Sequence, residues 1–184
     1  MWLVRMGWLG LCGGRESLPM LKALLPLFLS AIALSAQSSP ARPAFEKFPV
    51  ASIYDGEPAA PTLTKDQRMF RTVIRRGARS PVQFAGHYTV PEFGCGTGCS
   101  GSYFVDSITG RVFDGFIISD FPMEWREQHP ADPQTHIQFM PSSSLVKING
   151  CPNERDCGYY DYVMVEGKGL KLVQKWLLPK EFQE

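Results

Sequence analysis

Neither sign of charge dominates this sequence of 184 residues, which carries 19 Lys and Arg against 18 Asp and Glu. Nucleic-acid-binding domains usually have a strongly basic surface, so the net charge of +1 argues against nucleic acid as a partner. The most apolar run, Ala23–Leu34, has 12 residues, whereas a membrane-spanning helix needs about 20. The content of 44% hydrophobic and 20% charged residues is typical of a folded domain.

The common sequence signatures of catalytic sites are absent as well. The chain has no Gly-x-Ser-x-Gly motif, no phosphate-binding loop, no His-Glu-x-x-His motif and no calcium-loop pattern. His129 and His136 have no metal-like spacing with His87. We therefore expect no metal and no cofactor, and the sequence favours a binding protein over an enzyme.

The run Ala23–Leu34 has the length of the apolar core of a secretory signal peptide, with Lys22 as its positive flank and small residues after it. We expect residues 20–36 to form this signal peptide; a buried core helix is the alternative. Residues 1–19 fit a signal's short charged region poorly, so we expect them to be untranslated, with Met20 as the start. The expected product is exported to the periplasm or the cell exterior and has no transmembrane anchor after cleavage.

Proline is concentrated in the segment that follows. Residues 37–62 contain five prolines, which disfavour a helix and predict an extended lead-in. The remaining residues, 63–184, are expected to form a single globular domain, because a chain of this length is close to the size of one domain.

One segment of this domain has helical periodicity. Thr64 and Gln67 have the spacing of a capping box, and Gly77 is a natural stop, so we expect an amphipathic helix over residues 64–77. Its apolar face is formed by Met69, Phe70, Val73 and Ile74. Its opposite face is basic, through Arg68, Arg71, Arg75 and Arg79. The basic face indicates either a surface for anionic polymer or lipid, or a solvated helix face.

After this helix the apolar residues recur with a period near two, as in strands. Seven short strands are expected, over residues 84–90, 102–106, 111–118, 136–140, 145–149, 159–165 and 170–178. The predicted fold class is therefore α+β, with one N-terminal amphipathic helix packed on a curled antiparallel sheet of about seven short strands.

Removal of the signal peptide would leave an even number of cysteines, namely Cys95, Cys99, Cys151 and Cys157. An even count in an exported protein favours disulfides. Gly94, Gly96 and Gly98 can adopt positive φ, so that the chain can curl and bring Cys95 within bonding distance of Cys99.

Four arrangements of these cysteines compete. Two local disulfides are preferred, because the residues between Cys151 and Cys157 form a polar loop tip suited to a local clasp. Crossed pairing between the two segments is the first alternative. A zinc site of four thiolates and a catalytic thiol that acts with His87 are the others.

Two motifs carry a resemblance to known proteins. Phe84–Cys99 contains Phe-Ala-Gly-His-Tyr and Gly-Cys-Gly-Thr-Gly-Cys, and Asp106–Gly110 reads Asp-Ser-Ile-Thr-Gly. Both resemble a group of small, uncharacterised secreted bacterial proteins over about Phe48 to Trp176, although Phe93 stands where the group often has Trp. The resemblance implies export, a strand followed by a rigid loop and a hairpin, and it favours two independent local disulfides. It implies no activity.

We therefore expect an exported binding or inhibitor-like module of unknown ligand, with a disulfide-fixed glycine-rich recognition loop. The expected binding residues are His87, Tyr88, Gly94, Gly96, Thr97 and Gly98, with exposed aromatics such as Tyr103, Tyr159 and Tyr160. The first alternative is a small cell-wall hydrolase that uses His87 with a carboxylate such as Glu92. The second is an envelope protein that docks on anionic surfaces through Arg68, Arg71 and Arg75.

Overall fold

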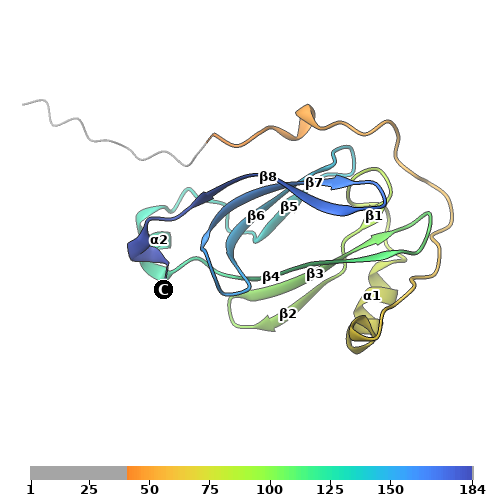
Figure 1. Cartoon of the computed structure of the whole chain (residues 1–184), viewed down its shortest axis with the longest axis horizontal. Helices are drawn as coiled ribbons and strands as arrows, with labels where there is room; N and C mark the ends of the chain where they lie inside the picture. The colour runs from red at the N-terminus through yellow and green to blue at the C-terminus, as the bar shows by residue number, and fades with distance from the viewer. Residues whose placement is uncertain (1–40, 184) are drawn as a thin grey trace, which may run out of the picture. The chain divides into compact units, whose positions relative to one another are not determined.

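A computed structural model describes residues 41–183 of the chain (Figure 1). The predictions for residues 1–19 and 20–36 lie outside the described residues. Within the described residues, no helix is both long enough and apolar enough to cross a membrane.

The described chain is mainly an antiparallel sheet of eight strands. Their bounds are β1 Tyr88–Thr89, β2 Glu92–Gly96, β3 Cys99–Asp106, β4 Val112–Ser119, β5 Ile137–Phe139, β6 Leu145–Pro152, β7 Gly158–Val165 and β8 Gly169–Leu177. The strand order is β1-β3-β4-β6-β7-β8, with β2 paired to β3 and β5 paired to β6. The sheet has two halves, β1–β4 and β5–β8, which join where the ends of β4 and β6 pair (Figure 1).

The prediction of an α+β fold built on one amphipathic N-terminal helix is wrong. The expected helix consists of a 3-10 helix, η2 (Asp66–Phe70), and an α-helix of seven residues, α1 (Arg71–Gly77). A second short helix, α2 (Met123–Gln128), lies in the connection between β4 and β5, and the 3-10 helix η3 (Lys180–Phe182) follows β8. The sheet, with eight strands instead of about seven, therefore determines the fold class.

The helix predicted over residues 64–77 differs from the observed one in its first turn, where the polar side chain of Gln67 is buried against the sheet. The capping box forms, since Thr64 N–H donates to Gln67 Oε1 at 3.0 Å and Gln67 N–H donates to Thr64 Oγ1 at 3.4 Å. Gln67 is buried, and its Nε2 donates to Asp114 Oδ1 on β4 at 2.8 Å. The first turn is a 3-10 helix, whose three-residue period changes which side chains face the core, and Met69 is 83% exposed.

The strands near the cysteine-glycine segment also differ from the prediction. Residues 84–90 form only the two-residue strand β1, because Ala85 and Gly86 have positive φ angles of 46° and 80° and turn the chain. The next segment, which was expected to be a loop, instead pairs with β3 as strand β2. This extra strand makes the β2–β3 hairpin that Cys95 and Cys99 close at its tip.

The two halves of the sheet enclose the main core. Phe104 and Ile118 come from the first half, and Val146, Ile148 and Tyr160 come from the second. Helix α1 covers the other face of β3, where Ile74 and Ala78 contact Tyr103, Val105 and Val112. Full burial of such side chains contributes about 1.5–3 kcal/mol each, so burial between the halves is the main force that holds them together.

The described part of the lead-in, residues 41–62, contains the 3-10 turn η1 (Phe45–Lys47) and runs beside the sheet (orange in Figure 1). Arg42 fixes its first part, because its guanidinium donates to Asp161 Oδ1 from Nη2 at 2.5 Å and from Nε at 2.9 Å. It also donates to Asn149 Oδ1 and to the carbonyl oxygen of Tyr160. The Asp161 side chain is 0% exposed and that of Arg42 is 10% exposed. The lead-in is thus attached to the second half of the sheet by a buried ion pair.

We expect Arg42→Ala to lower the free energy of unfolding by about 3–5 kcal/mol, because it removes the cation that contacts the buried Asp161 carboxylate. Urea unfolding followed by fluorescence measures the change. Lys47→Ala removes an exposed cation of the same lead-in and is the matched control. Equal stability of the two variants would show that the ion pair does not hold the lead-in.

Candidate functional site

The four described cysteines form two local disulfides, as preferred from the sequence. Cys95 bonds to Cys99 at the exposed tip of the β2–β3 hairpin. Cys151 bonds to Cys157 between β6 and β7, and both sulfurs belong to a buried cluster with Trp125. This pairing excludes crossed disulfides, a site of four zinc-bound thiolates and a catalytic thiol among these cysteines. Within residues 41–183, no group of three or more His, Cys, Asp or Glu residues is placed to hold a metal ion.

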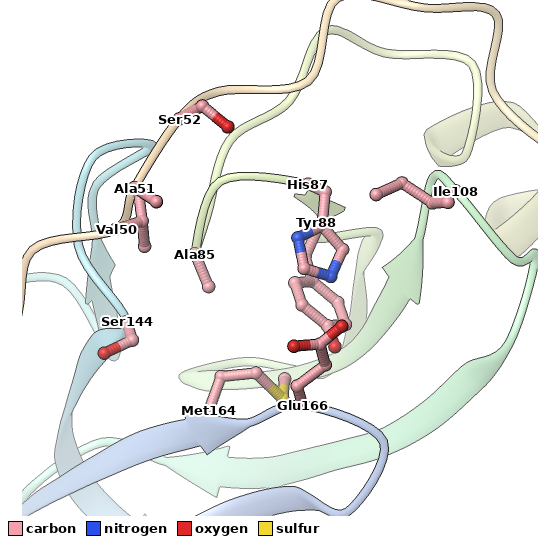
Figure 2. Close-up of a pocket in the computed structure, with 10 residues that line it drawn as sticks. All are labelled: Val50, Ala51, Ser52, Ala85, His87, Tyr88, Ile108, Ser144, Met164 and Glu166. Atoms are coloured by element: carbon pink, nitrogen blue, oxygen red, sulfur yellow. The ribbon is translucent and has the colours of Figure 1, made fainter.

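A cavity of about 360 Å³ lies where five separate segments of the chain meet (Figure 2). We call it the Tyr88 cavity. Its lining residues are Val50, Ala51, Ser52, Ala85, His87, Tyr88, Ile108, Ser144, Met164 and Glu166. The lead-in forms one wall, and the side chains of His87 and Tyr88 project toward the end of β7 in Figure 2. Sites for small molecules are usually concave pockets of about 300–1,000 Å³, so the cavity has a suitable size.

The turn before β1 puts His87 and Tyr88 in this cavity. Tyr88 N–H donates to the carbonyl oxygen of Phe84 at 2.8 Å, which closes the turn. Gly86 N–H donates to Pro141 O at 2.8 Å, and Tyr54 N–H of the lead-in donates to Gly86 O at 2.7 Å. A Cβ at position 86 would lie 2.6 Å from the carbonyl oxygen of Ser52. Only glycine therefore allows the lead-in to approach closely enough to form the wall.

The second motif, the Asp106–Gly110 turn, lies directly beside the first. Tyr88 pairs with Asp106 across β1 and β3, and Ser107 N–H donates to the carbonyl oxygen of His87 at 2.8 Å. The Asp106 carboxylate caps its own turn through Ile108 N–H at 2.9 Å and the Thr109 hydroxyl at 2.6 Å. His87 Nε2 is 3.9 Å from Asp106 Oδ1. The two motifs thus lie side by side, and both contribute residues to the lining of one cavity.

The hydroxyl group of Tyr88 is buried and has no hydrogen-bond partner among the described residues. Burial, followed by the negative charges of Asp106 and Glu166, raises the pKa of Tyr88 to about 12, and Arg111 opposes the shift. The group is therefore neutral at ordinary pH and is available as both donor and acceptor. An unsatisfied buried hydroxyl costs about 1–3 kcal/mol, which a ligand atom in the cavity could recover.

Other predicted site residues lie elsewhere. Glu92 lines a groove with Ser100 and His136, which is a different pocket from the cavity that His87 lines. Partial burial raises the pKa of Glu92 above its ordinary value, and the nearby His136 opposes part of this shift. The remaining predicted loop residues lie around the tip of the β2–β3 hairpin and are Gly94, Gly96, Thr97 and Gly98. The structure thus brings together His87 and Tyr88, but not the loop.

The predicted basic face is exposed. Arg68, Arg71 and Arg75 project from η2 and α1 and form no salt bridge with any carboxylate in the described part of the chain. The expectation of exposed aromatic side chains is wrong, because Tyr103, Tyr159 and Tyr160 are buried in the clusters around the sheet.

The sequence did not identify the residues that complete the Tyr88 cavity. Ser144 precedes β6, Met164 lies in β7, and Glu166 follows β7 in the turn to β8. Glu166 begins the sequence Glu-Gly-Lys-Gly, which is typical of a turn, but a turn sequence does not indicate what its first side chain will face. These residues reach the cavity only through the packing of one half of the sheet on the other.

We expect Tyr88→Phe to leave the free energy of unfolding at pH 7 unchanged or to raise it, because no protein hydrogen bond is lost. Tyr159→Phe is the matched control, since the Tyr159 hydroxyl donates to the Asp132 carboxylate. That variant should lose about 1–3 kcal/mol. Urea unfolding of both variants measures the difference, and a Tyr88→Phe variant destabilised as much as Tyr159→Phe would contradict the assignment.

The raised pKa of Tyr88 also predicts a pH dependence. The unfolded chain releases the phenolic proton near pH 10 and the folded chain releases it only near pH 12, so stability falls as pH rises between these values, by roughly 2–3 kcal/mol. Unfolding measured at pH 9, 10 and 11 should show about half of this fall, since pH 11 is the middle of the window, and Tyr88→Phe should reduce it. Parallel curves for the two proteins would contradict the prediction.

No protein-family model, no curated protein and no solved structure matches the chain.

Proposed function

We propose that the protein is an exported binding module that takes an aliphatic amine, free or on a larger ligand, into the Tyr88 cavity. The observation that carries this proposal is the buried Tyr88 hydroxyl, which has no partner in the described chain and belongs to a cavity with a carboxylate. The two disulfides support export, because such bonds form and persist in oxidising compartments.

The lining of the cavity supports an amine with an apolar stem. Glu166 is the carboxylate among the lining residues, and no Lys or Arg is among them. An ammonium group would donate to Glu166 and to the lone pairs of the neutral Tyr88 oxygen. Ala85, Ile108 and Met164 offer apolar contact for the carbon chain.

The walls of the cavity are fixed by hydrogen bonds in the free protein. Ala85 N–H donates to Ser143 O at 3.1 Å, and Val50 N–H of the lead-in donates to Ser142 O at 3.1 Å. A preformed site avoids the entropic cost of ordering its walls on binding. The geometry does not favour the alternative of hydrolysis by His87 and Glu92, because the two side chains line different cavities.

We expect 1,5-diaminopentane to bind in the Tyr88 cavity and to shift the backbone NMR signals of Gly86, His87, Tyr88 and Glu166. Glu166→Gln should weaken binding roughly two- to fivefold, as expected for a partly exposed ion pair. A heteronuclear NMR titration measures both effects. 1-Pentanol, which keeps the apolar stem and lacks the charge, should bind more weakly.

The matched control for this titration is Glu154→Gln, which removes an exposed carboxylate outside the cavity. It should bind the diamine as the unaltered protein does. Equal affinity of Glu166→Gln and Glu154→Gln, or NMR shifts at exposed carboxylates outside the cavity without those of Gly86 and Tyr88, would refute the proposal.

A further inference from the structure

A serine, a histidine and an aspartate form a hydrogen-bonded chain beside the β2–β3 hairpin. Ser100 Oγ lies 2.7 Å from His136 Nδ1, and His136 Nε2 lies 2.6 Å from Asp120 Oδ1. The order of groups is that of a nucleophile, its base and the carboxylate that orients the base. None of the three lines the Tyr88 cavity, so this site is independent of the function proposed above.

Three elements of the sheet hold the chain in place. Ser100 is the second residue of β3, and Asp120 follows the end of β4, where its N–H donates to Gly98 O at 2.7 Å. His136 immediately precedes β5, and its carbonyl oxygen accepts from Asn149 N–H of β6 at 2.8 Å. The imidazole therefore reaches from the second half of the sheet to two residues of the first half.

The aspartate fixes which nitrogen of the histidine carries the proton. A carboxylate only accepts hydrogen bonds, so His136 Nε2 must be the donor to Asp120. In the neutral imidazole this leaves a lone pair on Nδ1, and the Ser100 hydroxyl donates to it. Arg126 Nη1 bonds to the other carboxylate oxygen, Asp120 Oδ2, at 3.0 Å and holds the carboxylate in this orientation.

Two glycines of the hairpin, Gly98 and Gly94, lie beside this arrangement. A Cβ at position 98 would lie 2.7 Å from Asp120 Oδ2, so a side chain there would displace the carboxylate. Gly94 is the direct partner of Ser100 across β2 and β3, and side chains of directly paired residues share a face of the sheet. No atom lies within 4 Å of where a Gly94 Cβ would be. Space is therefore left beside Ser100 for a substrate.

Ser100 and His136 also line an accessible groove of about 520 Å³. Glu92 lies along one part of it, and Ile137, Gln138 and Phe139 lie along another. The Glu92 carboxylate would repel an anionic substrate once it is ionised, whereas the Phe139 side chain offers apolar contact. The groove therefore fits a small uncharged acyl compound better than an acid.

We propose that Ser100 and His136 are the catalytic residues of an esterase site for small uncharged carboxylic esters, with Asp120 as a positioning residue. Ser100 Oγ bonds to the ester carbonyl carbon while its proton passes to His136 Nδ1. The bond from this carbon to the alcohol oxygen breaks, and the alcohol leaves with that proton. Water then attacks the acyl group on Ser100 and gives a proton to Nδ1. Ser100 Oγ leaves and takes that proton back, and the net reaction converts ester and water into acid and alcohol.

A fluorophosphonate probe tests the nucleophile directly, because an activated serine displaces fluoride from phosphorus and keeps the phosphonyl group. We expect the disulfide-bonded protein to be labelled at Ser100, as located by peptide mass spectrometry. Ser100→Ala should abolish this label and should reduce 4-nitrophenyl acetate hydrolysis to background. His136→Gln should slow both reactions about 10²-fold or more, the usual contribution of a general base.

His129→Gln is the matched control, because His129 stacks on Trp125 and its Nδ1 bonds to a backbone carbonyl outside the groove. It should be labelled as fast as the unaltered protein. Near-UV circular dichroism verifies folding, and labelling of the unaltered protein and His136→Gln decides the question even if Ser100→Ala does not fold. An unlabelled Ser100 in the folded protein, or equal labelling in His136→Gln, would overturn the proposal.

The role of Asp120 has its own readout. Asp120→Asn should slow labelling and alter the ¹⁵N shifts of the His136 ring, because an amide no longer dictates which nitrogen carries the proton. Arg126→Gln removes the salt bridge to Asp120 but keeps the Asp120 carboxylate. In this variant the ¹⁵N shifts of the His136 ring should therefore remain those of the form protonated at Nε2. Unchanged shifts and an unchanged labelling rate in Asp120→Asn would show that the aspartate is only structural.

Discussion

The junction between the two halves of the sheet is the constraint on which the described structure depends. Ile118 pairs with Pro152, and Ser119 pairs with Cys151, at the ends of β4 and β6. The bond from Cys151 to Cys157 lies in the buried cluster at this junction. The cavity and the groove each take residues from both halves. Because interiors are densely packed and transmit strain, the angle at this junction sets the geometry of both sites.

Features determined by neighbouring residues could be predicted from the sequence. The two disulfides are examples, since each closes a short loop whose glycine or polar residues allow it. The capping box at Thr64 and Gln67 is another, because its hydrogen bonds join residues three apart. The hairpins β3–β4 and β7–β8 also follow from turn residues between alternating runs. In each case the deciding interaction lies within a few positions of the pattern that indicates it.

Features that depend on distant contacts could not be predicted. Gln67 donates a hydrogen bond to Asp114 on β4, which is 47 positions away in the sequence. The periodicity of the helical segment does not indicate this contact. His136 has no metal-like spacing with His87, and its partners Ser100 and Asp120 lie 36 and 16 positions away in the sequence. Sequence spacing identifies groups that share one element, whereas these groups are joined by strands of different hairpins.

The lead-in has a consequence for the order in which the cavity can form. Arg42 and Asp161 are 119 positions apart, and the lead-in supplies one wall of the cavity. Contacts between residues so far apart carry a larger entropic cost of loop closure than local contacts do. A chain that is synthesised from its N-terminus therefore holds the lead-in without its anchor until β7 has been made. The protein cannot capture a ligand in this cavity until nearly its whole length is available to fold.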